Sequence, residues 1–133
     1  MSAKKFNTRI ILPSKTLIEK EVGLVNAPGD DGIFGVLAEH SNFVSALKVG
    51  ILQLFTNETS ENYFIYGGIC EVRDNSVNII TEFAADIGRA DKNVVNKEIS
   101  SLKDDLLKEH QDEANKQIIN NKITRLNSLL EFI

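Results

Sequence analysis

The spacing of the apolar residues in this chain changes near residue 90. Before that point, short segments rich in Val, Ile, Leu, Phe and Tyr alternate with turn residues. Beyond it, apolar residues recur every three or four positions, and residues 91–133 contain no Gly or Pro. A period of two is typical of strands and a period of 3.6 is typical of helices. The sequence therefore predicts a β half followed by an α half.

The β half is expected to form short strands between turn signals such as residues 28–32 and 57–60 and the pair Asp74-Asn75. The alternation is clearest over residues 77–83. The predicted strands cover residues 6–12, 16–21, 23–27, 33–37, 43–47, 50–56, 63–66, 69–73 and 77–83. Parallel strands need crossover connections, and no helical period precedes residue 90. We therefore expect an antiparallel β-sandwich over residues 1–85, and a linker over about 86–90.

The α half, residues 91–133, is expected to form an antiparallel helical hairpin. Two apolar stripes share the spacing i, i+4, i+7 and i+11: Val95, Ile99, Leu102 and Leu106, then Ile119, Ile123, Leu126 and Leu130. Asp91 and Asp112 are predicted N-caps, because a carboxylate can accept the unpaired amides of the first helical turn. The short connector at residues 110–112 implies that the helices fold back on each other.

Ile118 and Leu129 lie beside the second stripe and widen its apolar arc beyond what one partner helix requires. This surplus could rest on the sandwich of the same chain or on another protein. The sequence leaves both alternatives open.

Composition excludes several classes of function. The net charge is −4, without the basic excess of a nucleic-acid-binding protein. The apolar runs are short, and residues 1–6 lack the apolar core of a signal peptide, so we expect membrane association only through a partner. Cys70 is the single cysteine, cannot form an internal disulfide, and is predicted to be a buried structural thiol.

Three patterns could suggest chemistry, and each has a simpler interpretation. Gly29, Gly32 and Gly35 are spaced like a nucleotide-binding loop, but a strand-like segment follows instead of a helix, so tight turns explain them. Asp30 and Asp31 lack the further ligands of a calcium loop. His40 has no evident partners, so a structural or interface role is expected. The sequence thus predicts no catalytic residue, metal site or cofactor.

The resemblance to a known family rests on motifs in order. These are GDDGIFGV at residues 29–36, His40, SALKVG at 45–50, GGICEV at 67–72 and KITRL at 122–126. Together with a sandwich followed by two helices, they resemble the epsilon subunits of F-type ATP synthases, which are equivalent to the mitochondrial delta subunit. Each motif is weak alone, but their order and spacing are specific, and the match covers nearly the whole chain.

The resemblance implies a non-catalytic rotor subunit of the central stalk in a proton-translocating ATP synthase. Such a subunit binds the gamma subunit and the c-ring, and couples their rotation to ATP synthesis. By resemblance, the contact with the c-ring falls near Asp31, Ile33, His40 and Asn42. The location implied is peripheral, on the cytoplasmic face of a bacterial inner membrane.

The resemblance also implies a regulatory hairpin that changes between a compact and an extended form and, when extended, inhibits ATP hydrolysis. Ile118, Lys122, Arg125 and Leu129 are candidates for its contact with gamma or the catalytic alpha/beta head. Lys122 and Arg125 form only a short basic patch, so we expect modest inhibition.

The chain departs from the family pattern in two places. The family usually has Pro near the positions of Ala38 and Asn42. Val94 stands where ATP-binding members have Arg, which predicts weak or absent ATP binding. Two rival interpretations are a free-standing binding module with a helical tail and a small enzyme that uses His40.

Overall fold

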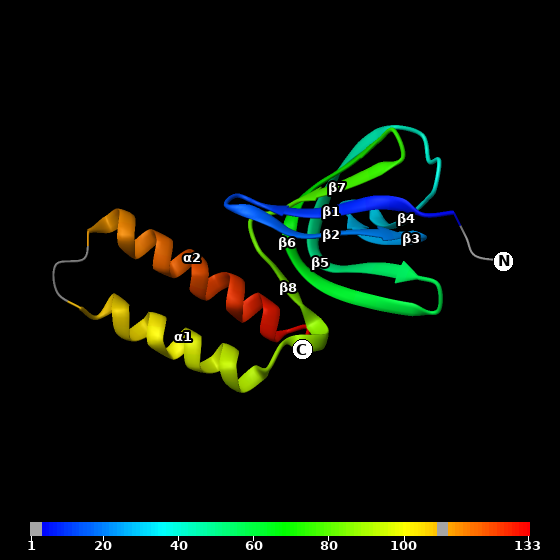
Figure 1. Ribbon diagram of the computed structural model, residues 1–133. Coiled ribbons are helices and arrows are strands. Elements are labelled where there is room, and N and C mark those ends of the chain that lie inside the picture. Colours follow the sequence, from blue (N-terminus) through cyan, green and yellow to red (C-terminus); the bar gives the residue numbers. More distant parts are fainter. Residues whose placement is uncertain (1–3, 109–111) are drawn as a thin grey trace. The chain divides into compact units, whose positions relative to one another are not determined.

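The computed structural model describes residues 4–108 and 112–133. The chain forms two compact units, Met1–Gly88 and Arg89–Ile133. The first unit is built from strands and the second from two helices, so the predicted fold class is confirmed (Figure 1). In the described part of the chain, neither helix has the length and apolar character needed to cross a membrane.

The first unit is a β-sandwich whose strands form one hydrogen-bonded sheet that folds over its own core. The neighbours in the sheet follow the order β2-β1-β7-β6-β5-β3-β4, and β8 pairs separately with β6. The strands are β1 (Phe6–Leu12), β2 (Lys15–Val22), β3 (Leu24–Gly29), β4 (Gly32–Leu37), β5 (Phe43–Thr56), β6 (Thr59–Arg73), β7 (Ser76–Ile80) and β8 (Ala84–Asp86).

Two strands are much longer than predicted. β5 and β6 pair along their whole lengths and curve through the sandwich (Figure 1), so the predicted breaks near residues 48–49 and 67–68 are wrong. Gly50 lies inside β5 instead of ending a strand. Pro28 packs against it, and a Cβ atom added at Gly50 would lie only 2.9 Å from the Cβ of Pro28. Gly67 and Gly68 sit inside β6 with φ of 73° and 128°, which allows the strand to bend.

One strand pair is parallel within the otherwise antiparallel sandwich. β1 runs parallel to β7, with Thr8 opposite Val77 and Ile10 opposite Ile79. The expectation that every pair would be antiparallel is therefore wrong for these two strands. A parallel pair needs a long connection, and here β2 to β6 together supply it in place of a single crossover helix.

The predicted strand at residues 77–83 ends earlier than expected, and a separate short strand follows after residue 83. β7 ends at Ile80, and β8 pairs antiparallel with Tyr63–Ile65 of β6. Between them, the Phe83 carbonyl accepts the Tyr66 amide at 3.0 Å, and the Phe83 ring meets the Phe64 ring edge-on. A short 3₁₀ helix, Ile87–Arg89, follows β8.

The core of the sandwich draws its side chains from most of the strands. It includes the fully buried Ile10, Val22, Val25, Ala27, Leu52, Leu54, Ile65, Cys70 and Ile79. Burial of each such aliphatic side chain is worth about 1.5–3 kcal/mol before conformational entropy is subtracted.

The second unit is an antiparallel pair of helices, α1 (Lys92–Leu106) and α2 (Glu113–Leu130) (Figure 1). Both predicted caps are confirmed: the Asp91 carboxylate accepts the amides of Asn93 and Val94, and Asp112 accepts the amide of Asn115. The stripes are the buried sides, since Val95, Ile99, Ile123 and Leu126 are all buried. Of the predicted connector, residues 110 and 111 lie outside the described part of the chain.

Candidate interaction surfaces

The edge strand β4 exposes two large apolar side chains. Ile33 is 77% exposed and Leu37 is 61% exposed, whereas Val36 is buried. Alternation along a strand places Ile33 and Leu37 on the outer side and Phe34 and Val36 on the inner side. An edge strand with exposed apolar residues is a natural place for another protein to bind.

The four residues predicted for the c-ring contact lie on both sides of β4. Asp31 and Ile33 lie at its beginning, and His40 and Asn42 lie in the loop after its end. All four are exposed. Along the chain, β4 therefore lies between the two pairs.

His40 contacts backbone and aromatic groups in the structure. Its Nδ1 lies 2.7 Å from the carbonyl oxygen of Ser41, and its ring lies 4.9 Å from that of Phe43, centroid to centroid. Phe43 in turn meets Phe34 at 5.5 Å. Among the described residues, no three potential metal-binding side chains gather at one place. The rings connect the loop after β4 to β4 itself.

The four candidates in the hairpin lie along one side of α2. Ile118, Lys122, Arg125 and Leu129 share the spacing i, i+4, i+7 and i+11, beside the stripe of Ile123 and Leu126. Their exposure differs, because Ile118 is 53% exposed and Leu129 only 3%. Ile118 and Lys122 therefore present surface in this structure, while Leu129 does not.

The segment that resembles an ATP-binding motif is a helix N-terminus. Asp91 Oδ1 accepts the Asn93 amide at 2.7 Å and the Val94 amide at 3.4 Å, so capping accounts for this carboxylate. Val94 is 61% exposed and offers no group that could bond to a phosphate.

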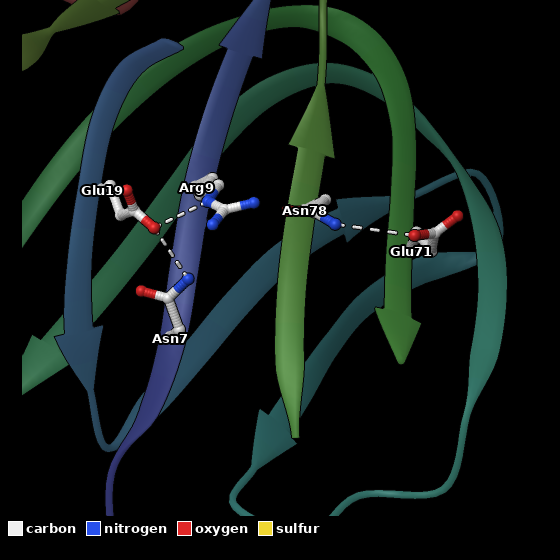
Figure 2. Close-up of polar contacts among 5 residues, drawn as sticks. All are labelled: Asn7, Arg9, Glu19, Glu71 and Asn78. Atoms are coloured by element: carbon white, nitrogen blue, oxygen red, sulfur yellow. Dashed lines mark hydrogen bonds and ion pairs between the residues drawn. The ribbon is translucent and has the colours of Figure 1, made fainter. Parts of the chain in front are cut away.

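A row of polar side chains crosses the outer face of β2, β1, β7 and β6 (Figure 2). Strand pairing places Glu19 opposite Arg9, Arg9 opposite Asn78, and Asn78 opposite Glu71. Arg9 Nε donates to Glu19 Oε2 at 2.7 Å, and Asn7 Nδ2 donates to the same oxygen at 3.0 Å. The bonds from Arg9 and Asn7, in that order, hold the pKa of Glu19 below its ordinary value.

No local pattern in the sequence indicates this row. Its members come from four strands, and the register that brings them together cannot be read from local patterns. Alternation within residues 6–12 and 16–21 indicates only that Arg9 and Glu19 could face solvent. Only the register of β1 against β2 shows that these two residues lie opposite each other.

Cys70 is fully buried in the sandwich core, as predicted. Burial raises the pKa of its thiol to about 12. A thiol is a nucleophile only when ionised, so Cys70 fills space in this fold.

Comparison with known proteins gives consistent matches. The family described as "ATP synthase, Delta/Epsilon chain, beta-sandwich domain" matches residues 5–87. An ATP synthase epsilon chain of Leptospira borgpetersenii is 39% identical over 85 residues, covering 64% of this chain and 67% of the relative. The epsilon chain of a Bradyrhizobium species is 32% identical over 113 residues, covering 85% of this chain and 84% of the relative.

A similar fold occurs in a solved structure of the mitochondrial ATP synthase of Euglena gracilis. The TM-score is 0.64 at 21% identity, with 98% of this chain and 82% of that chain covered. That structure contains OSCP, F1 and the c-ring. This match extends through both units, whereas the family match ends at residue 87.

Proposed function

Because this chain belongs to the ATP synthase delta/epsilon chain family, we propose that it is a non-catalytic subunit of the central stalk. In this role it turns with the gamma subunit and the c-ring of a proton-translocating F-type ATP synthase. It thereby couples their rotation to ATP synthesis in the head. It is held peripherally, on the cytoplasmic face of a bacterial inner membrane, through the complex.

The observation that carries the proposal is the exposed edge of the sandwich at β4. Ile33 and Leu37 are both largely exposed there, and Asp31 directly precedes the strand. Association that covers this surface gains about 25 cal/mol per Å² of apolar area removed from water. We propose that Asp31, Ile33, His40 and Asn42 belong to the region that meets the c-ring.

Co-purification tests the assembly. A tagged copy expressed in its own host should bring gamma and c subunits out of detergent-solubilised membranes. Ile33→Glu places a charge on the exposed edge and should reduce that recovery several-fold. Leu107→Glu is the matched control, because Leu107 is 83% exposed but belongs to the helical unit. Recovery of the chain alone would instead support a free-standing binding module.

The second unit gives the proposal a regulatory part. We propose that α2 uses Ile118, Lys122, Arg125 and Leu129 toward gamma or the alpha/beta head, and that it inhibits ATP hydrolysis modestly. Leu129 is buried in this structure, so its contact requires the hairpin to rearrange first. Only Lys122 and Arg125 on this side are basic, and exposed ion pairs are worth about 0–1 kcal/mol. ATP hydrolysis by complexes that carry the whole chain, or residues 1–88 only, measures the inhibition. A large rise on removal of the hairpin, reversed by the whole chain but not by its Lys122→Ala/Arg125→Ala form, would contradict modest inhibition.

A further inference from the structure

The loop after β4 is held by the turn between β6 and β7. Asn75 Oδ1 accepts the backbone amide of Glu39 at 2.7 Å. Asn42 Oδ1 accepts the backbone amide of Asp74 at 3.0 Å, and Asn42 Nδ2 lies 3.5 Å from Asp74 Oδ1. These bonds join segments more than 30 residues apart in the sequence. We call Asn42, Asp74 and Asn75 the loop latch.

Glu39 needs such support because its backbone is strained. Its φ is 64°, a left-handed conformation that residues other than Gly rarely adopt. The His40 amide donates to the Leu37 carbonyl at 3.3 Å, which closes a tight turn with Glu39 at its third position. Such turns usually have Gly at that position. A strained residue persists where its surroundings hold it, and Asn75 bonds directly to its amide.

The turn that holds the loop is itself well defined. Asp74 and Asn75 have φ of 49° and 62°, between the paired residues Arg73 and Ser76. Two left-handed residues in a two-residue hairpin turn match the twist of the flanking strands, and Asp and Asn tolerate this conformation. The turn is therefore a firm support from which the Asn75 side chain reaches the loop.

We infer that the loop latch positions the loop of His40 for binding to the rotor, and that Asn42 acts by holding this loop rather than by touching the partner. The inference rests on the proposed function. An ordered loop binds without the entropic cost of ordering on contact. The four predicted contact residues thus have two different roles. Asp31, Ile33 and His40 are exposed and available to a partner, whereas the Asn42 side chain is already bonded to Asp74.

Amide hydrogen exchange of the whole free chain tests the first step. Asn75→Gly keeps a residue that accepts positive φ but removes the oxygen that accepts the Glu39 amide. Exchange of that amide should accelerate roughly three- to tenfold, which corresponds to the net free energy of one hydrogen bond. Asn75→Asp keeps an acceptor oxygen and should restore protection. Asn57→Gly and Asn57→Asp are matched controls, because Asn57 has φ of 54° in the turn at the other end of β6.

Binding to a detergent-solubilised subcomplex of gamma and the c-ring tests the second step. Asn75→Gly and Asn42→Ala should each weaken affinity by a similar three- to tenfold. Their effects should not add fully in the double variant, because both brace one loop. Asn75→Asp should recover affinity, and both Asn57 variants should bind like the unchanged chain.

The outcomes separate this inference from the proposed function. If the unchanged chain does not bind the subcomplex, the proposed function fails, whatever the exchange data show. If it binds and Asn75→Gly speeds exchange without weakening affinity, the positioning role is overturned. If Asn42→Ala weakens affinity while the Asp74 amide keeps its protection, Asn42 contacts the partner directly and the inference is wrong.

Discussion

The sandwich and the hairpin build their buried cores from different numbers of elements. Sandwich residues such as Ile10, Leu52 and Ile65 are fully buried and come from separate strands. In the hairpin, Val95, Ile99, Ile123, Leu126 and Leu129 keep 3–8% of their surface exposed. Many strands must separate before the sandwich core opens, whereas two helices share one seam. The hairpin is therefore the part that can rearrange at lower cost, as a regulatory element requires.

The largest effect is expected in the sandwich core. Leu52→Ala should lower the free energy of unfolding by about 2–5 kcal/mol, because it removes buried contacts and leaves a cavity. Both tyrosines, Tyr63 and Tyr66, lie in β6, so tyrosine fluorescence during urea unfolding reports on the sandwich. Leu37→Ala is the control: Leu37 is 61% exposed, and the change should stay within about 0.5 kcal/mol. Equal losses would contradict the assigned core.

A core change in the hairpin should act on the helices alone. Ile123→Ala should destabilise the hairpin by about 2 kcal/mol, since Ile123 is buried in the seam. Circular dichroism at the helical band should then lose its signal at lower urea concentration, while the tyrosine transition stays in place. If both transitions shift together, the two units unfold as one and the contrast between them breaks down.

A smaller effect is expected at the start of α1. Asp91→Ala removes the acceptor for the amides of Asn93 and Val94 and should cost the hairpin about 1 kcal/mol. The helical signal during urea unfolding measures this loss. Asp91→Asn keeps a good capping group and should be nearly neutral. A loss of equal size in Asp91→Asn would show that charge, and not the hydrogen bonds, is what matters here.

The smallest effect concerns the exposed ion pair of Arg9 and Glu19. The pKa of Glu19 lies below 4.5 in the folded chain, so its contribution to stability is present above the unfolded pKa and is lost as pH falls through the folded value. Arg9→Ala should raise the pKa of Glu19 toward 4.5, as followed by NMR titration. Asn7→Ala should raise it less, and added salt should weaken the difference. An unchanged pKa in Arg9→Ala would contradict the assigned cause.

Features that depend on neighbouring residues could be predicted from the sequence, and features that depend on distant residues could not. The helical stripes, both N-caps and the turn at Asp74-Asn75 follow from residues a few positions apart, and the structure confirms them. The family resemblance is also confirmed by the match over residues 5–87. The continuity of β5 and β6 was missed, because Gly50 and Gly68 look like strand breakers until their neighbours are known.

The candidate contact region shows the same division. The sequence identified Asp31, Ile33, His40 and Asn42 by their motif, and their contact with a partner stays a prediction. It could not show that Asn42 bonds to Asp74. That bond joins Asn42 to a hairpin turn formed more than 30 residues later.

The division into a β half and an α half follows from the sequence, because hydrophobic period, caps and turn residues act over only a few neighbouring positions. Tertiary contacts were needed to establish the parallel pairing of β1 with β7, the polar row from Glu19 to Glu71, and the loop latch. Each of these joins residues distant in sequence, and their pairing depends on strand register and on the packing of the whole sandwich. A shift of one residue would turn every side chain of a strand to the opposite face, so only the assembled sheet fixes which of them meet.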